Sequence, residues 1–216
     1  MKIGIIGITG RMGSVLSKII PNAEKNGGSS SKTSREELVE IISNSDVLID
    51  FSVPSSLLEA VTVAAKYKVP VISGTTGLSE NDFKQIREFS YIIPILHANN
   101  FSLGIHLMAV LIKKCADVLT DFDFSIIDKH HNRKKDSPSG TALFLAKQTT
   151  QKAQIVSLRE GNIFGQHICD FAGENEILSI SHEAFNLEVF ASGALKCAYW
   201  IVKKNPNLYT IADYLK

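Results

Sequence analysis

Cysteine, tryptophan and long apolar runs are scarce in this sequence. It has 3 cysteines and 1 tryptophan among 216 residues. The cysteines Cys115, Cys169 and Cys197 are far apart and form no Cys-x-x-Cys pair, so they indicate free thiols in a reducing compartment rather than a disulfide framework or a zinc site. No apolar stretch approaches the roughly 18 residues of a membrane-spanning helix. These absences predict a soluble protein of the cytoplasm.

An excess of charge of either sign is also missing. The 23 Lys and Arg residues balance 22 Asp and Glu residues, for a formal net charge of +1. This balance gives no electrostatic reason to expect nucleic acid or a membrane surface as a partner. The N-terminal apolar run, residues 3–8, is too short for a signal peptide. The length allows one large domain or two small ones, each with its own core.

The first hundred residues alternate between strand and helix patterns. Apolar runs typical of buried strands cover 3–8, 47–51, 69–72 and 92–96. Helices follow them: one ends at Pro21, one begins with a Ser34–Glu37 capping box, one opens at Ser56 and one is capped by Ser79. This alternation predicts a doubly wound, parallel α/β sheet.

After residue 100 the pattern changes. Residues 103–119 predict one long amphipathic helix, whereas 122–127 and 176–180 alternate apolar and polar residues. Alternation is typical of strands that bury one face and leave the other for a partner. The segment 194–216 reads as helical, interrupted near Pro206. We therefore expect a second, smaller α+β domain.

A glycine-rich turn is the first ligand signal. The strand at 3–8 leads into Gly7, Gly10 and Gly13, which open the first helix. Glycines here permit a tight turn and let backbone N–H groups approach a pyrophosphate. The GxxGxxG spacing differs from the commoner GxGxxG, so the motif depends on its strand–turn–helix context. The alternative is a glycine-rich turn without a ligand.

Two more turns follow the later strands. They are Gly74-Thr75-Thr76-Gly77 and Ala98-Asn99-Asn100-Phe101-Ser102. Ligands bind at the carboxyl ends of strands in open α/β sheets, and these hydroxyl and amide groups suit a nicotinamide ribose and carboxamide. Taken singly, either turn could instead satisfy its own backbone.

The choice between NADH and NADPH depends on the segment 27–35. Dinucleotide folds usually carry a ribose-binding acid there, but this segment has no acid and no clear strand. Its hydroxyl and cationic groups could instead bind the 2′-phosphate of NADPH: Ser29, Ser30, Ser31, Lys32 and Arg35. The alternative is a solvated, mobile loop. We predict a preference for NADPH.

The densest polar cluster spans residues 128–142. The adjacent His130 and His131 can exchange protons near neutral pH, and Lys134 supplies a positive charge or a proton. The N–H groups of Gly140 and Thr141, at the start of a helix, could receive a carboxylate. The alternative is a solvated charged face.

This cluster resembles the motif of the dihydrodipicolinate reductases. The resemblance rests on His-His-x-x-Lys followed by Asp-x-Pro-Ser-Gly-Thr-Ala, and on Gly-x-x-Gly-Arg-Met-Gly at the start. Asp50-Phe51-Ser52 with Pro54, and the later Arg159, His167 and His182, fall in the same order. The match spans nearly the whole chain, which is short for the family.

The resemblance implies an NAD(P)H-dependent reductase that converts 4-hydroxy-tetrahydrodipicolinate to tetrahydrodipicolinate in diaminopimelate and lysine biosynthesis. It assigns proton transfer to His130, a second catalytic role to Lys134, and the substrate carboxylates to His131, Gly140 and Thr141. No metal is implied. The implied dinucleotide-binding residues are Gly7, Ile8, Thr9, Gly10, Arg11, Met12, Gly74, Thr75, Thr76, Ala98, Asn99, Asn100 and Phe101.

The resemblance also implies the domain organisation and assembly. A Rossmann-like domain at 1–101, completed by 191–216, would bind the dinucleotide. A domain at 102–190 would bind the substrate and form a homotetramer. One departure is Leu187, which stands where the family tends to carry an arginine. Two alternatives remain: a catalytically silent dinucleotide sensor, and another small Rossmann reductase, which would not explain His-His-x-x-Lys.

Overall fold

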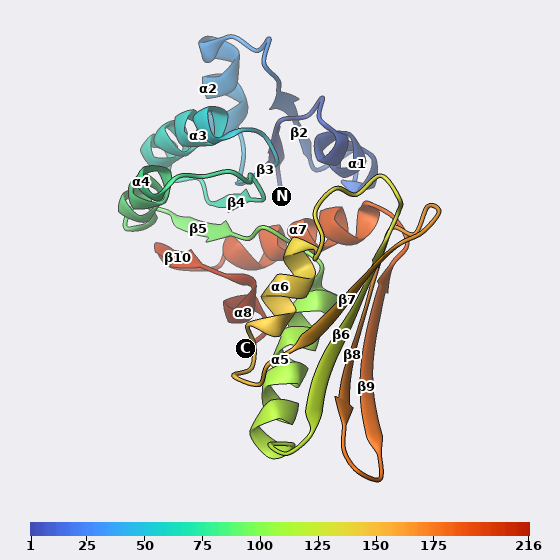
Figure 1. The fold of residues 1–216 in the computed structure, drawn as a ribbon. Coiled ribbons are helices and arrows are strands. Elements are labelled where there is room, and N and C mark those ends of the chain that lie inside the picture. The colour runs from blue at the N-terminus through green and yellow to red at the C-terminus, as the bar shows by residue number, and fades with distance from the viewer. The chain divides into compact units, whose positions relative to one another are not determined.

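Two units, each with its own sheet, make up the protein. The computed structural model describes residues 1–216. The first unit comprises Met1–Phe101 and Leu187–Lys216, and the second comprises Ser102–Asn186. The chain therefore leaves the first unit once and returns to it (Figure 1).

The first unit is built on a six-stranded, wholly parallel sheet. Its central strands are buried on both faces, which explains their uninterrupted apolar sequences. The strand order is β10-β5-β4-β3-β1-β2. The strands are β1 (Ile3–Ile6), β2 (Lys25–Ser29), β3 (Val47–Asp50), β4 (Val71–Ser73), β5 (Pro94–His97) and β10 (Asn207–Tyr209).

Helices cover both faces of this sheet. The layer α2–α3–α4 packs on one face, and α1 with α7 packs on the other (Figure 1). Because β1 lies between β2 and β3, right-handed crossovers place α1 and α2 on opposite faces. This is the predicted doubly wound fold. The helices are α1 (Arg11–Ile19), α2 (Arg35–Ser43), α3 (Pro54–Tyr67), α4 (Glu80–Ser90), α7 (Glu188–Ile201) and α8 (Ile211–Tyr214).

Side-chain caps fix where two of these helices begin. The predicted capping box of α2 is present, since Ser34 accepts from the Glu37 N–H and Glu37 accepts from the Ser34 N–H. Ser79 and Asp82 form the same reciprocal pair at α4. Helix α3 begins at Pro54 rather than at Ser56, because proline is favourable in the first turn, where its missing N–H is not needed.

Two sequence expectations for this unit were wrong. The segment 27–35 does contain strand structure, because β2 runs to Ser29 and pairs with β1. The tail is not helical throughout: α7 ends at Ile201, and β10 pairs with β5 before the short α8. Both strands are short, and β2 has the sequence Lys-Asn-Gly-Gly-Ser. Their hydrogen-bond partners, β1 and β5, lie elsewhere in the sequence, so no local pattern predicts these two strands.

The second unit is a four-stranded mixed sheet of order β7-β6-β8-β9. Strands β6 and β8 alternate between buried and half-buried residues, as a sheet covered on one face requires. Helices α5 and α6 pack their apolar residues on that face. This confirms the predicted second α+β fold. The elements are α5 (Leu103–Val118), β6 (Asp123–His130), α6 (Gly140–Ala146), β7 (Gln154–Arg159), β8 (Gly165–Ala172) and β9 (Ile177–Ala184). No helix in the structure is long and apolar enough to cross a membrane.

Candidate active site

Strand β6 carries an acid and a histidine on the buried face of its sheet. Its inward residues are Phe124, Ile126, Asp128 and His130, so the alternation that buries two apolar side chains also buries two polar ones. Asp128 is fully buried, and His130 ends the strand. A buried carboxylate requires partners, because burial without them costs several kcal/mol.

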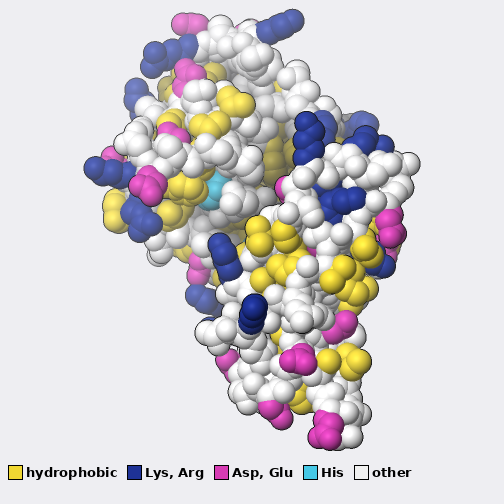
Figure 2. All heavy atoms as spheres, in the orientation of Figure 1, with side chains coloured by type: hydrophobic (Ala, Val, Ile, Leu, Met, Phe, Trp, Pro, Cys, Tyr) yellow, Lys and Arg dark blue, Asp and Glu magenta, His cyan; other side chains and the backbone are white.

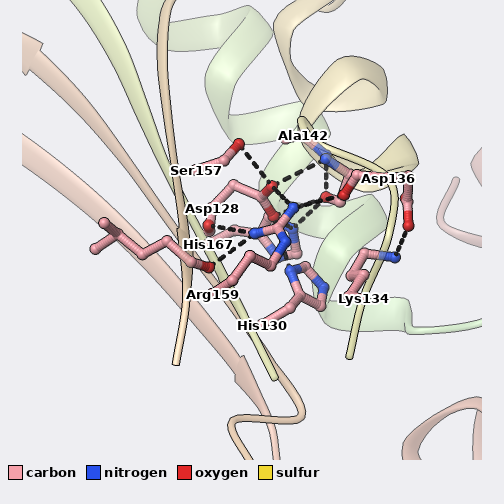
Figure 3. Close-up of polar contacts among 10 residues, drawn as sticks. Asp128, His130, Lys134, Asp136, Ala142, Ser157, Arg159 and His167 are labelled. Atoms are coloured by element: carbon pink, nitrogen blue, oxygen red, sulfur yellow. Dashed lines mark hydrogen bonds and ion pairs between the residues drawn. The ribbon is translucent and has the colours of Figure 1, made fainter. Parts of the chain in front are cut away.

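Asp128 meets this requirement with donors from the cap of α6 and from β7 (Figure 3). Ser139, the residue that caps α6, donates its N–H to Oδ2 at 2.9 Å and its hydroxyl to Oδ1 at 2.7 Å. Ser157 and Arg159, both on β7, donate to Oδ2 at 3.2 and 3.0 Å. The same carboxylate therefore fixes α6 and the end of β7 against β6.

Two histidines lie close to Oδ1 of Asp128, the oxygen that also accepts from the Ser139 hydroxyl. His130 Nδ1 lies 2.9 Å from Oδ1, at ion-pair distance but outside the angle of an aligned hydrogen bond. His167 Nε2 lies 3.2 Å from the same oxygen, because Asp128 and His167 pair across β6 and β8. The two rings meet edge to face, with centroids 5.3 Å apart.

The surroundings keep Asp128 ionised. Burial alone would raise its pKa, but contacts from His130, His167 and Ser139 outweigh burial and hold the pKa well below the usual range. Ligand atoms of Asp128, His130 and His167 lie within 4.8 Å of one another, a spacing that could hold a metal ion. However, protein donors already occupy both oxygens, and Arg159 supplies a cation at 3.0 Å. The chemistry of the set fits a hydrogen-bonded cluster better than a metal centre.

Lys134 lies in the loop between β6 and α6. Its N–H bonds to the His131 carbonyl at 3.1 Å, so a tight turn keeps it next to the histidine pair. Its Nζ lies 2.9 Å from Asp136 Oδ1 (Figure 3). Lys134, mainly through a hydrogen bond, lowers the pKa of Asp136. Lys134 is therefore paired with the carboxylate of Asp136 in this structure.

The substrate-binding candidates lie on the same loop and helix. Partial burial, and then the positive charge of Arg133, lower the pKa of His131. Gly140 and Thr141 are the first residues of α6. A Cβ built on Gly140 would meet nothing within 4 Å, and a backbone hydrogen bond from Gly140 helps to lower the pKa of Asp136. The second unit therefore brings the five predicted substrate and catalytic residues onto one strand end, its loop and the following helix: His130, His131, Lys134, Gly140 and Thr141.

In the first unit, the glycine turn between β1 and α1 is tightly packed. Gly7 has φ +83°, which glycine adopts without strain, and a Cβ on Gly13 would lie 2.2 Å from the Gly7 carbonyl oxygen. Only glycine at 13 lets α1 pack this closely on the turn. The N-cap of α1 is Gly10, with no side-chain cap and no acid in the first turn. The N-terminus of α1 is therefore suited to an anion.

The other two predicted turns lie at the same edge of the sheet. Segments 74–76 and 98–101 follow β4 and β5, and 7–12 follows β1, so all three occupy carboxyl ends of parallel strands. Gly74 is held against Phe51, whose ring would lie 2.1 Å from a Cβ at that position. The Phe51 ring meets that of Phe101 edge to face, at 5.5 Å.

A buried acid at the end of β3 is bonded to the turn at 74–76. Asp50 accepts hydroxyl hydrogen bonds from Ser52, from Ser73 at 2.8 Å and from Thr75 at 2.7 Å. Burial raises its pKa, and these three bonds oppose the rise. The Thr75 hydroxyl also accepts from the Ser52 N–H at 3.0 Å. Its side chain thus connects the end of β3 with the turn that follows β4.

The segment after β2 is an ordered turn. The Ser30 N–H donates to Thr33 Oγ1 at 2.9 Å, and the Lys32 N–H donates to Ser30 Oγ at 3.2 Å. Ser31, Lys32 and Arg35 are exposed. Ser30, Ser31 and Lys32 thus follow the carboxyl end of β2, where the ribose-binding acid would stand. The one carboxylate near it in sequence, Glu24, instead accepts from the Tyr199 hydroxyl at 2.5 Å, before β2 begins.

Sequence reasoning gave no role to Asp128, Arg159 or His167. Arg159 pairs with His130 across β6 and β7, and His167 pairs with Asp128 across β6 and β8. These contacts depend on strand register, which one sequence does not reveal. One local signal was available: Asp128 and His130, two residues apart, continue the inward alternation of Phe124 and Ile126.

Known protein families match both parts of the chain. Residues 1–101 match the family model described as dihydrodipicolinate reductase, N-terminus, and residues 104–215 match its C-terminus model. The chain belongs to the dihydrodipicolinate reductase family. A 4-hydroxy-tetrahydrodipicolinate reductase of Caldanaerobacter subterraneus subsp. tengcongensis is 38% identical, over 98% of this chain and 97% of that protein. One of Rickettsia bellii is 36% identical, over 100% and 95%. The predicted family is confirmed.

Solved structures agree on the fold. A dipicolinate-bound dihydrodipicolinate reductase from Paenisporosarcina sp. TG-14 matches with a TM-score of 0.82 at 21% identity, over 97% of each chain. An aspartate dehydrogenase from Thermotoga maritima matches with a TM-score of only 0.52 at 11% identity, over 95% of this chain and 98% of that one. The reductase family therefore shares more of this architecture than the aspartate dehydrogenase does.

Proposed function

We propose that this protein reduces 4-hydroxy-tetrahydrodipicolinate to tetrahydrodipicolinate with NAD(P)H, in diaminopimelate and lysine biosynthesis. The observation that carries the proposal is full-length similarity to reductases of that name, combined with an intact His-His-x-x-Lys loop. The nicotinamide supplies the hydride when it is bound. The protein must supply a proton, bind a dianion and exclude water.

His130 is assigned the role of proton donor. Lys134 is assigned the role of polarising or protonating the reacting imine. Reduction of an unsaturated ring needs a proton donor beside the reacting carbon or nitrogen, and histidine can act as one near neutral pH. His130 ends β6 with Asp128 beside its Nδ1. Lys134 already pairs with one carboxylate, Asp136, and a substrate carboxylate or imine could take its place.

The two substrate carboxylates are assigned to His131 and to the start of α6. The N–H groups of Gly140 and Thr141 belong to the first helical turn, at the positive end of the helix dipole. Because the pKa of His131 is lowered, this ring acts as a neutral hydrogen-bonding group over most of the physiological range.

The dinucleotide is assigned to the edge formed by 7–12, 74–76 and 98–101. The close approach of Gly13 to Gly7 and the uncapped N-terminus of α1 fit a pyrophosphate. We further propose a preference for NADPH, supported by Ser30, Ser31 and Lys32 at the end of β2 in place of an acid.

The assembly is proposed to be a homotetramer of the cytoplasm. Outward residues of the second sheet include Val156 and Ile177, which are 53% and 66% exposed. Apolar residues on the open face of a sheet favour pairing with another copy. Three free cysteines, two of them buried, suit a reducing compartment.

A coupled assay tests the proposed reaction. The upstream synthase, in excess, would generate the substrate from pyruvate and aspartate semialdehyde, and nicotinamide absorbance would be followed after adding this protein with NADPH or NADH. We expect oxidation that depends on the synthase and a larger kcat/KM with NADPH. Dinucleotide binding without oxidation would refute the reaction, and equal kcat/KM values would refute the preference alone.

A further inference from the structure

The carboxylate of Asp128 is the one anion shared by the two buried histidines of the second unit. Oδ1 lies 2.9 Å from His130 Nδ1 and 3.2 Å from His167 Nε2, while Oδ2 accepts from Ser139, Ser157 and Arg159. Oδ1 also accepts from the Ser139 hydroxyl at 2.7 Å, so structural donors reach both oxygens, whereas both histidines face Oδ1. Asp128 is therefore both a structural cross-link and the anion beside His130.

We propose that Asp128 is the positioning residue of the proton donor: it binds Nδ1 of His130, so that Nε2 is the atom that exchanges a proton with substrate. The inference rests on the proposed function, in which His130 is the proton donor. In the transfer, the Nε2–H bond breaks, a bond from that hydrogen to the substrate forms, and the electron pair stays on Nε2. Nδ1 keeps its hydrogen throughout, facing the carboxylate.

Space around the ring supports this orientation. Gly165, the first residue of β8, lies beside His130, and a Cβ there would be 3.1 Å from Nε2. Glycine at this position thus leaves room next to the atom that must reach substrate. The angle at Nδ1 is not that of a linear hydrogen bond, and catalytic contacts of this kind commonly tighten only when substrate binds.

The His130 ring has charged or titratable neighbours on β6, β7, β8 and the loop that follows β6. Asp128 on β6 is the anion at ion-pair distance from the ring, whereas Arg159 on β7 and His167 on β8 contact the same carboxylate. The following loop adds His131 and Lys134, with Asp136 paired to Lys134. Asp128 is the one carboxylate at ion-pair distance from His130, so its removal should act more strongly than any other single change.

Two substitutions near His130 are expected to shift the pH dependence of kcat in opposite directions. Asp128→Asn should lower kcat by about 10–100-fold, as loss of an orienting partner does, with the KM for dinucleotide unchanged. It should also move the alkaline limb of the kcat pH profile to lower pH, because an adjacent anion has been lost. His167→Leu removes a competing donor to Asp128 and should move this limb in the opposite direction. The matched control is Asp170→Asn, a half-buried β8 acid bound to Ser179 at 2.6 Å.

The histidine ¹⁵N spectrum of the wild-type protein provides a test that needs no Asp128 variant to fold. The His130 signals, assigned as those lost in His130→Gln, should show a protonated Nδ1 and an unprotonated Nε2 in the neutral ring. The opposite tautomer would overturn the proposal, as would a folded Asp128→Asn enzyme with wild-type kcat and pH profile. An inactive wild-type enzyme with the expected tautomer would instead refute the proposed function.

Discussion

At the scale of single residues, the sequence reveals a motif but not the partners of its members. His130 and Lys134 are candidates from sequence alone because their spacing forms a local motif. The partners of His130 could not be predicted, since Asp128, Arg159 and His167 meet through the register of three strands. Thr75 shows the same limit: a hydroxyl in a predicted ligand turn donates instead to buried Asp50.

The cysteines illustrate how burial controls reactivity. Burial, with Asp170 nearby, raises the pKa of Cys169 to about 12, and burial raises the pKa of Cys197 to about 12. The thiolate is the reactive form. In native protein, we expect a disulfide reagent to label Cys115 alone, and to label three thiols in denaturant. Cys115→Ser should abolish the native reaction, and rapid native labelling of that variant would contradict the assignment.

The exposed Lys32 tests the cofactor proposal. Its loss should remove a charged contact to the 2′-phosphate, worth about 1.5–3 kcal/mol. Lys32→Ala should therefore raise the KM for NADPH about 10-fold or more and leave the KM for NADH unchanged. Lys84→Ala, an exposed lysine on α4, is the control. Equal effects on both nucleotides would mean that Lys32 does not distinguish them.

At the scale of elements, helices were easier to predict than short strands. The starts of α2 and α4 follow from capping residues three positions apart, which are visible in the sequence. Strand β2 has the sequence Lys-Asn-Gly-Gly-Ser, and β10 has three residues. Their hydrogen bonds come from β1 and β5, so only the assembled sheet defines them.

Helix α7 must pass close to the end of the 98–101 segment. A Cβ on Gly193 would lie 1.8 Å from the Phe101 carbonyl oxygen. Overpacking typically costs about 1–3 kcal/mol, so Gly193→Ala should lower stability by at least that amount and weaken dinucleotide binding. Urea unfolding and nucleotide titration would measure both. Ser192→Ala, exposed on the same helix, should change neither. Wild-type stability in Gly193→Ala would show that this contact is not tight.

At the scale of the whole molecule, the predicted dinucleotide-binding residues and the predicted catalytic residues lie in different units. The dinucleotide candidates lie in Met1–Phe101, and the catalytic and substrate candidates lie in Ser102–Asn186. The change from buried apolar runs to alternating strands after residue 100 indicated the two fold types. The strand order of the second sheet did not follow from sequence, because β6 pairs in parallel with β7 and antiparallel with β8.

The stability of the protein should depend on pH through Asp128. Its pKa lies below the unfolded value of about 3.9, so its contribution is complete above about pH 5 and is lost as pH falls further. The difference in unfolding free energy between wild type and Asp128→Asn should therefore be larger at pH 7 than at pH 3.5. Urea unfolding followed by circular dichroism measures it. A difference that does not vary with pH would contradict the ionised, bonded carboxylate.

The most direct test of the account is the coupled reductase assay on wild type, His130→Gln and Lys134→Ala, with dinucleotide affinity measured on the same samples. General acid catalysis is worth about 10²–10⁴ in rate. We predict rapid wild-type oxidation, kcat lowered by about that factor in each variant, and unchanged dinucleotide binding. Folded variants that retain wild-type kcat would contradict the proposed active site.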